Sequence, residues 1–186
     1  MSSHPSPGRI FVMSGASGTG KTTLSRQLEK ELGLFFSVSA TTRPPRAGEE
    51  QGRDYRFLSR EEFDKMVQEG RFLEWASVHG QFYGTPREPI ERNLAQGRDV
   101  LLDLDTQGAL NLKKLVPQAV LIFIKPPSIE ELRKRLESRG TDSPETIAGR
   151  ISRAEHEIEQ SVHYDHVVVN HDLDQAKREL KDIISA

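Results

Sequence analysis

One stretch, Gly15-Ala16-Ser17-Gly18-Thr19-Gly20-Lys21-Thr22, constrains this chain more than any other. It matches the phosphate-loop pattern of Gly, four free positions, Gly, Lys and Ser or Thr at every defined site. An apolar run at 10–13 predicts a buried strand before it, and leucines four apart at 22–32 predict a helix after it. Such a loop turns backbone N–H groups and the positive helix end toward an anion. We therefore expect a nucleoside triphosphate here, with Lys21 on its outer phosphates and Thr22 on Mg²⁺. The alternative is a glycine-rich turn that matches by chance.

Further apolar runs predict a central sheet. They do not alternate with polar residues, as expected of parallel strands that helices cover on both faces. The four runs are 10–13, 100–104, 120–124 and 167–169. Helical patterns lie between and after them, at 87–96, 129–137, 144–162 and 174–184. Strands that alternate with helices indicate an α/β fold with a mainly parallel sheet flanked by helices.

Two stretches interrupt this rhythm. Residues 36–83 are too many for one crossover, and they carry strand-like pieces at 36–40, 54–58 and 72–78. We interpret them as a small mixed insert with a mostly antiparallel sheet. A second stretch, about 125–160, is helical and rich in arginine, with a break at Gly140, and this pattern predicts a helical flap.

The composition bounds the remaining possibilities. The chain has 186 residues, enough for one domain with inserted parts. Its net charge of −2 creates no overall field that would attract nucleic acid or an anionic membrane, and no apolar run approaches a membrane span. It has no cysteine, which excludes disulfides and thiol metal sites. We expect no nucleic-acid or membrane partner, a flexible tail at 1–8 and, by default, a cytoplasmic location.

Two carboxylates end one of the apolar runs. Asp103 and Asp105 lie in Val100-Leu101-Leu102-Asp103-Leu104-Asp105, where strand alternation would put both on one face. A carboxylate at the end of such a strand, beside a phosphate loop, commonly serves Mg²⁺ directly or through water. We expect one of them to serve the metal and the other a substrate. For each, the alternative is a helix N-cap or a turn residue.

Arginines gather in both interruptions. Arg43 and Arg46 flank two prolines, which stiffen the loop, so the pair forms either a fork for a phosphate monoester or a solvated basic turn. Arg135 and Arg139 lie one helical turn apart, and Arg150 follows on the next helix. Interleaved glutamates favour a merely solvated surface there, whereas the phosphate loop favours a lid that brings arginines over phosphates.

The chain resembles the guanylate kinases, which move the γ-phosphate of ATP to GMP, from about residue 8 to its end. The resemblance rests on several separated segments: 37–49 (SVSATTRPPRAGE), 54–55 (DY), 72–74 (FLE), 83–85 (YGT), 102–108 (LDLDTQG), 126–128 (PPS) and 135–140 (RLESRG). Together these segments are far more specific than the phosphate loop alone.

The resemblance implies roles for the matching positions. The GMP phosphate and sugar would be surrounded by Ser39, Arg43, Arg46, Tyr55 and Tyr83. Ser39 and Thr85 would reach guanine O6, and Glu74 and Asp105 would accept hydrogen bonds from guanine N1–H and the 2-amino group. On the ATP side, residues 15–22 would hold the phosphates, Asn170 would contact adenine, and Thr22 and Asp103 would hold Mg²⁺, Asp103 through water. The residues implied to be catalytic are Lys21, Arg135, Arg139 and Arg150.

Three positions depart from the family's pattern. Ala16 stands where many relatives have Pro, at a free position of the loop. Phe82 replaces a common Tyr, which removes one hydroxyl and leaves Tyr83. His171 stands where Asp is frequent, which bears on the base end of the ATP site.

The fold implied is that of a P-loop nucleoside-monophosphate kinase. Its core would comprise 9–36, 91–126 and 157–186, its mixed α/β GMP-binding insert 37–90, and its helical lid 127–156. We expect a single such domain, monomeric or homodimeric, that phosphorylates GMP and also dGMP. The alternatives are an inactive guanylate-kinase-like binding module and a kinase for another monophosphate. The intact loop argues against the first, and the acids Glu74 and Asp105 argue against AMP as the acceptor.

Overall fold

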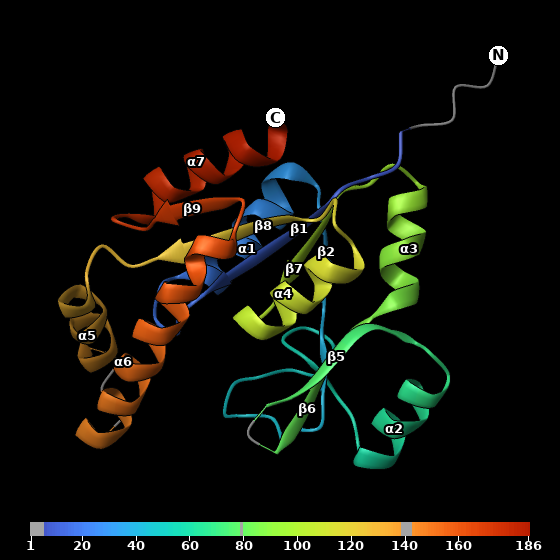
Figure 1. Ribbon diagram of the computed structural model, residues 1–186, viewed down its shortest axis with the longest axis horizontal. Helices are drawn as coiled ribbons and strands as arrows, with labels where there is room; N and C mark the ends of the chain where they lie inside the picture. Colours follow the sequence, from blue (N-terminus) through green and yellow to red (C-terminus); the bar gives the residue numbers. More distant parts are fainter. Residues whose placement is uncertain (1–5, 79, 139–142) are drawn as a thin grey trace.

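A computed structural model of the chain describes residues 6–78, 80–138 and 143–186 (Figure 1). Five parallel strands form its central sheet, in the order β2-β7-β1-β8-β9. The strands are β1 (Ile10–Gly15), β2 (Phe35–Ser37), β7 (Val100–Asp103), β8 (Val120–Lys125) and β9 (His166–Val169). The predicted parallel α/β architecture and its four strands are confirmed, and β2 is an additional edge strand.

Helices cover both faces of this sheet, which explains why its strands are apolar throughout. Phe11 of β1 lies in one buried cluster and its neighbour Val12 in another, on the opposite face. The first cluster is completed by α1 (Lys21–Leu32) and α7 (Leu173–Ser185), and the second by α3 (Arg87–Ala95) and α4 (Thr106–Leu115). Alternate side chains of the strand therefore enter different apolar layers.

Two helices, α2 (Arg60–Gln68) and α4, lie where we predicted none. A capping box starts α2: the Ser59 hydroxyl accepts from Glu62 N at 3.1 Å, and Ser59 N donates to Glu62 Oε2 at 2.7 Å. Only Phe63 and Met66 of α2 are buried, and most of its other residues are charged. Two apolar positions are too few to reveal the helical repeat in the sequence. Asp105 caps α4 and thereby ends the extended run that starts at β7.

A second sheet forms a lobe beside the central one, lower in Figure 1. Its order is β4-β3-β6-β5, with β3 (Ala40–Thr41), β4 (Arg56–Phe57), β5 (Phe72–Val78) and β6 (Gln81–Pro86). The β3–β6 and β6–β5 pairs are antiparallel, and β3–β4 is parallel. The single strand predicted at 36–40 is wrong, because the chain leaves the central sheet after Ser37 and enters this one at Ala40.

Helices α5 (Ile129–Ser138) and α6 (Pro144–Glu159) pack against each other at the other end of the central sheet (Figure 1). The predicted helix at 144–162 is α6 followed by a short 3₁₀ turn, η1 (Gln160–His163). Ala16 of the phosphate loop is 1% exposed and belongs to the apolar cluster of these two helices. The loop is therefore part of the packing that holds α5 and α6.

Of the helices in the described ranges, none has the length and apolar character needed to cross a bilayer.

The smaller sheet has a buried cluster of its own, which yields a prediction. Phe63 is fully buried there and stacks on Phe72 with ring centroids 4.6 Å apart. We expect Phe63→Ala to lower the free energy of unfolding by about 3–5 kcal/mol, because the cavity left by the ring cannot collapse fully. Urea denaturation followed by circular dichroism measures this change. As a control, Val162→Ala removes an exposed side chain and should cost less than about 0.5 kcal/mol; a similar loss in both variants would contradict the prediction.

Candidate active site

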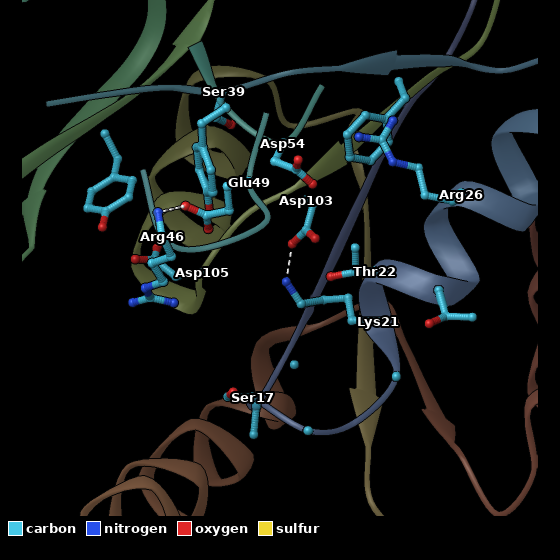
Figure 2. Close-up of a pocket in the computed structure, with 18 of the residues that line it drawn as sticks. Ser17, Lys21, Thr22, Arg26, Ser39, Arg46, Glu49, Asp54, Asp103 and Asp105 are labelled. Carbon is cyan, nitrogen blue, oxygen red and sulfur yellow. Dashed lines mark hydrogen bonds and ion pairs between the residues drawn. The ribbon is translucent and has the colours of Figure 1, made fainter. Parts of the chain in front are cut away.

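A cavity of about 520 Å³ lies where the phosphate loop, the carboxyl ends of β1 and β7, and the smaller sheet meet (Figure 2). Its wall includes most of the predicted residues: Gly15, Ala16, Ser17, Gly18, Gly20, Lys21, Thr22, Ser39, Arg43, Arg46, Tyr55, Tyr83, Asp103 and Asp105. Several predicted residues lie elsewhere in the described part of the chain: Thr19, Glu74, Thr85, Arg135, Arg150 and Asn170. Arg139 is outside the described residues.

The phosphate loop has the backbone that its glycines allow. Gly18 and Gly20 have φ of 96° and 83°, in the left-handed region that residues with a Cβ rarely adopt. Gly20 caps the N-terminus of α1, so the backbone N–H groups of the first turn have no side-chain cap. The Thr19 hydroxyl donates to Ala16 O at 2.8 Å, which turns this side chain into the loop and away from the cavity. The loop is therefore shaped to bind an anion with its backbone.

Asn170 supports the loop from behind. It is 2% exposed, and its Nδ2 donates to Thr19 O at 2.7 Å. A Cβ on Gly20 would lie 2.8 Å from the same nitrogen, so only glycine leaves room for this contact. Within the described residues, Asn170 Oδ1 is buried without a hydrogen-bond partner. Arg135 of α5 donates to Asn170 O at 3.1 Å, so this guanidinium sits at the turn after β9.

Strand pairing brings Lys21 and Asp103 together. In the register of β1 with β7, Met13 lies opposite Asp103, so the loop that follows β1 starts beside this carboxylate. Lys21 Nζ pairs with Asp103 Oδ1 (Figure 2), and Thr22 borders the same space. An ammonium group, a hydroxyl and a carboxylate thus converge at the helix start.

Asp105 lies on the same cavity wall for a different reason from the one we predicted. Strand β7 ends at Asp103, so strand alternation does not place residue 105. Its side chain is the N-cap of α4: Oδ1 accepts from Gly108 N at 2.7 Å. The N-cap alternative is therefore confirmed, and it fixes the carboxylate in place at the edge of the cavity (Figure 2).

Glu74 lies next to Asp105 but deeper. A Cβ built on Gly108 would be 3.2 Å from Asp105 Oδ1 and 3.6 Å from Glu74 Oε2, so the two carboxylates meet at this glycine. Glu74 is 8% exposed and borders a second cavity of about 460 Å³. A bulge in β5 before Glu74 sets its register opposite Thr85, whose hydroxyl donates to Glu74 Oε1 at 2.5 Å.

Burial dominates the titration of Glu74. Desolvation raises the pKa of its carboxyl to about 7, the hydrogen bond from Thr85 lowers it in part, and the nearby Asp105 raises it further. The group is therefore poised between its neutral and charged forms near neutral pH. Two hydrogen-bond donors placed against it would favour the carboxylate.

Basic and aromatic groups of the smaller lobe form the opposite wall. Arg43 lies over the ring of Tyr55 at 5.3 Å, and the rings of Tyr55 and Tyr83 are 6.1 Å apart. Burial raises the pKa of Tyr55 to about 12, so it stays a hydroxyl donor at physiological pH. These groups can bind a phosphate with cations and with hydroxyl donors.

Sequence reasoning missed several residues that line this cavity. Glu49 forms an ion pair with Arg43. Arg26 of α1 lies over the Phe36 ring at 4.3 Å, and Glu157 of α6 also lines the cavity. Burial raises the pKa of the Glu157 carboxyl, and the charge of Lys21 opposes this shift. Arg26 follows Thr22 by one helical turn, which is a usable signal, whereas only the fold places Glu157 here.

Comparison with known proteins identifies the family. A family profile described as "Guanylate kinase" matches residues 7–186. The guanylate kinases of Thermus thermophilus and Neisseria gonorrhoeae are 51% and 53% identical to this chain, over 96% of its length and over 81% and 88% of theirs. A crystal structure of guanylate kinase from Anaplasma phagocytophilum has a TM-score of 0.81 at 37% identity, covering 97% of this chain and 86% of that one.

A gluconokinase structure from Sinorhizobium meliloti, with a TM-score of 0.53 at 18% identity, shares the fold alone. The profile match spans the described chain, and relatives about half identical cover nearly all of it. The chain belongs to the guanylate kinase family.

Proposed function

We propose that this chain transfers the γ-phosphate of ATP to GMP, with the acceptor between the smaller lobe and Asp105 and the donor on the phosphate loop. The observation that carries the proposal is the meeting of Glu74 and Asp105 at Gly108: Asp105 borders the cavity that also contains Lys21, and Glu74 borders the second cavity. Two acids beside a phosphate loop suit an acceptor whose base carries hydrogen-bond donors and whose other end carries a negatively charged phosphate.

Guanine fits the acids and adenine does not. Guanine presents N1–H and a 2-amino group as donors, whereas the matching edge of adenine presents N1 as an acceptor. A buried carboxylate left without donors costs binding energy, so the pair rejects adenine as well as accepting guanine. In this proposal Glu74 and Asp105 accept from the base, and Ser39 and Thr85 serve O6.

The phosphate of GMP would lie against Arg43, Arg46, Tyr55 and Tyr83. A guanidinium presents N–H donors in adjacent pairs, which suits the oxygens of a phosphate monoester. One of these phosphate oxygens then forms a bond to the γ-phosphorus as the bond from that phosphorus to the β–γ bridging oxygen breaks, and ADP leaves with the bridging oxygen. Because the attacking oxygen is already anionic near neutral pH, no strong base is required.

ATP would lie with its phosphates on residues 15–22 and its base near Asn170. The buried, unpartnered Oδ1 of Asn170 matches the amino donor of adenine. Arg135, which donates to Asn170 O and His171 O after β9, would be close to that end of the nucleotide. Lys21 would leave Asp103 for the outer phosphates, where it stabilises the charge of the moving group.

Thr22 and Asp103 would hold Mg²⁺, which supplies Lewis-acid stabilisation of the phosphate oxygens when bound. The residues fit this ion, because Mg²⁺ in kinases takes few protein ligands and is held largely by nucleotide phosphates and water.

The division into parts is also proposed. The core would comprise 9–36, 91–126 and 157–186, the GMP-binding insert 37–90 and the lid 127–156. Arg150 and Arg139 would come over the phosphates when the lid closes, which would exclude water and limit ATP hydrolysis. A cytoplasmic location, a monomeric or homodimeric state and the use of dGMP stay predictions.

Acceptor-dependent ADP formation tests the proposal directly. The enzyme with Mg²⁺ and ATP is assayed with GMP, dGMP, AMP, UMP or no acceptor. We expect rapid ADP formation with GMP and only background with AMP, UMP or no acceptor. Equal rates with AMP and GMP would refute guanine selection, and background rates with every acceptor would favour a binding module.

Replacing one acid tests base selection. We expect Glu74→Gln to raise the KM for GMP at least about 10²-fold while AMP gains little, because the amide offers one acceptor and sets its own donor against guanine. Steady-state kinetics with both acceptors measure the ratio. Glu61→Gln, an exposed glutamate of α2, is the matched control. Unchanged GMP kinetics in Glu74→Gln would refute the assignment of this residue.

The same residue predicts how stability depends on pH. The folded pKa of Glu74 is about 7 and the ordinary value is 4.5, so the unfolded chain releases this proton first as pH rises. The stabilising contribution is complete below pH 4.5 and is lost as pH approaches and passes 7. We expect Glu74→Gln to gain up to about 3 kcal/mol of stability relative to the parent between pH 4.5 and 8. Urea titrations at both pH values measure it, and a pH-independent difference would contradict it.

Lys21 yields the prediction on turnover. We expect Lys21→Ala to lower kcat by about 10²-fold or more, because no other group in the loop can neutralise the moving phosphate. GMP binding should survive, since the acceptor groups lie on other elements; calorimetric titration with GMP checks this. Lys65→Ala, on the exposed side of α2, is the control. Near-normal kcat in Lys21→Ala would exclude the proposed role of the loop.

A further inference from the structure

The second cavity, of about 460 Å³, lies where helix α4 packs against strand β5 (Figure 1). Its volume falls in the range of sites that bind small organic ligands. Apart from Glu74, none of its wall residues has a role in the proposed transfer. The residues that matter below come from the C-terminal end of α2, the start of β5 and the last two turns of α4: Val67, Leu73, Trp75, Asn111, Lys114 and Leu115.

Two large apolar side chains are exposed at this cavity. Trp75, the one tryptophan of the chain, meets the ring of Phe63 at 6.4 Å and that of Phe82 at 6.2 Å. These contacts hold the indole in place, yet 46% of Trp75 is exposed. Leu115, on the α4 side, is 62% exposed. A ligand that covers both side chains would therefore gain from the burial of apolar surface.

Helix α4 adds polar groups to the same wall. Asn111, Lys114 and Leu115 share one face of α4, because residues three and four apart lie on the same side of a helix. Asn111 Oδ1 accepts from Gln107 Nε2 at 3.0 Å, and this contact leaves the Nδ2 of Asn111 as a donor. Lys114 is exposed, and among the residues that the structure describes no carboxylate pairs with it. The α4 side therefore offers an ammonium group and an amide N–H to a ligand.

The acid of the cavity lies near a different turn of α4. Glu74 borders the cavity from β5, and a Cβ built on Gly108 would lie 3.6 Å from its Oε2. Lys114 follows Gly108 by six residues, which is about 9 Å along a helix that rises 1.5 Å per residue. The favourable place for an anionic group is therefore the end of the cavity at Lys114, away from Glu74.

We propose that the second cavity binds a small aromatic acid. Its planar ring system would pack on Trp75 and Leu115, and its anionic group would bind Lys114 and Asn111. The proposal goes beyond the proposed function and does not depend on it, because the site contains no residue of the phosphate loop. Since α4 packs on the central sheet and β5 belongs to the smaller one, the ligand would contact both parts of the molecule.

A merely apolar cavity makes a different prediction. Glu74 and the carbonyl end of α4 both repel a nearby anion, so without a contribution from Lys114 the acid group of a ligand would bring no gain. A charge change at Lys114 would then affect an acidic ligand and its neutral counterpart alike. The two cases are therefore separated by a pair of probes that differ only in the acid group.

The first experiment uses 8-anilinonaphthalene-1-sulfonate and the neutral N-phenyl-1-naphthylamine, which has the same rings without the sulfonate. Each is titrated into the full chain, and quenching of Trp75 together with probe fluorescence gives its Kd. We expect Lys114→Glu to raise the Kd of the sulfonate about fivefold or more and that of the neutral probe less than about twofold.

The matched control is Lys30→Glu, which changes an exposed lysine in the last turn of another helix, α1. It should leave the Kd of both probes unchanged within about twofold. An unchanged Kd of the sulfonate in Lys114→Glu, or an equal loss of both probes, overturns the proposal. An equal loss of the sulfonate in Lys30→Glu also overturns it, because the effect would then reflect only the net charge.

A second pair of variants tests the apolar contact. We expect Leu115→Ser to raise the Kd of both probes about threefold or more, because the ligand loses apolar surface on the α4 side. Val162→Ser, at another exposed apolar position, is the control and should change neither. The melting temperature of each variant is measured alongside, since probes of this kind also bind partly unfolded chains. If Leu115→Ser retains the parent Kd for both probes, they bind elsewhere and the proposal fails.

Competition with GMP separates this site from the nucleotide cavity. We expect saturating GMP to change the Kd of the sulfonate by less than about threefold, because its anionic group lies at Lys114 and not at the phosphate-binding arginines. Displacement of the sulfonate in proportion to bound GMP would place it in the nucleotide cavity and overturn the proposal. A chain that binds the sulfonate through Lys114 but forms no ADP with GMP would refute the proposed function alone.

Discussion

The pairing of β1 with β7 is the constraint on which the rest of the structure depends. Parallel strands in register release their carboxyl ends at one edge, so the loop after β1 and the acids after β7 emerge side by side. Lys21 then meets Asp103, and Asp105 is held close by as the cap of α4. The smaller lobe needs only to present its arginines to an edge where the acids and the loop are already in place.

Selectivity and stability oppose each other in Glu74. A carboxylate that is 8% exposed is costly to charge, as its raised pKa shows, yet only the charged form accepts two donors well. The Thr85 hydroxyl offsets part of this cost. Asp105 avoids the conflict, since its N-cap bond to Gly108 gives it a partner at all times.

Local patterns predicted the parts whose signals are local. The phosphate loop, the four apolar strands and the long helices follow from spacing and periodicity, and family resemblance named the acids and arginines. The features that neither the patterns nor the resemblance predicted depend on contacts between residues far apart in the chain. Asp105 looked like a strand residue because the cap of α4 is visible only once β7 is known to end at Asp103. Glu49 lies in a recognisable segment, but its grip on Arg43 is a matter of side-chain geometry.

Ala16 carries a consequence for engineering. Because this residue of the phosphate loop is buried among the apolar side chains of α5 and α6, the loop and these helices form one packing unit. Chimeras that transplant only the helices from a homologue with proline at this point would set Ala16 against side chains that pack on a ring, and the missing ring atoms would leave a cavity. Chimeras within the family should therefore take residue 16 and both helices from the same parent.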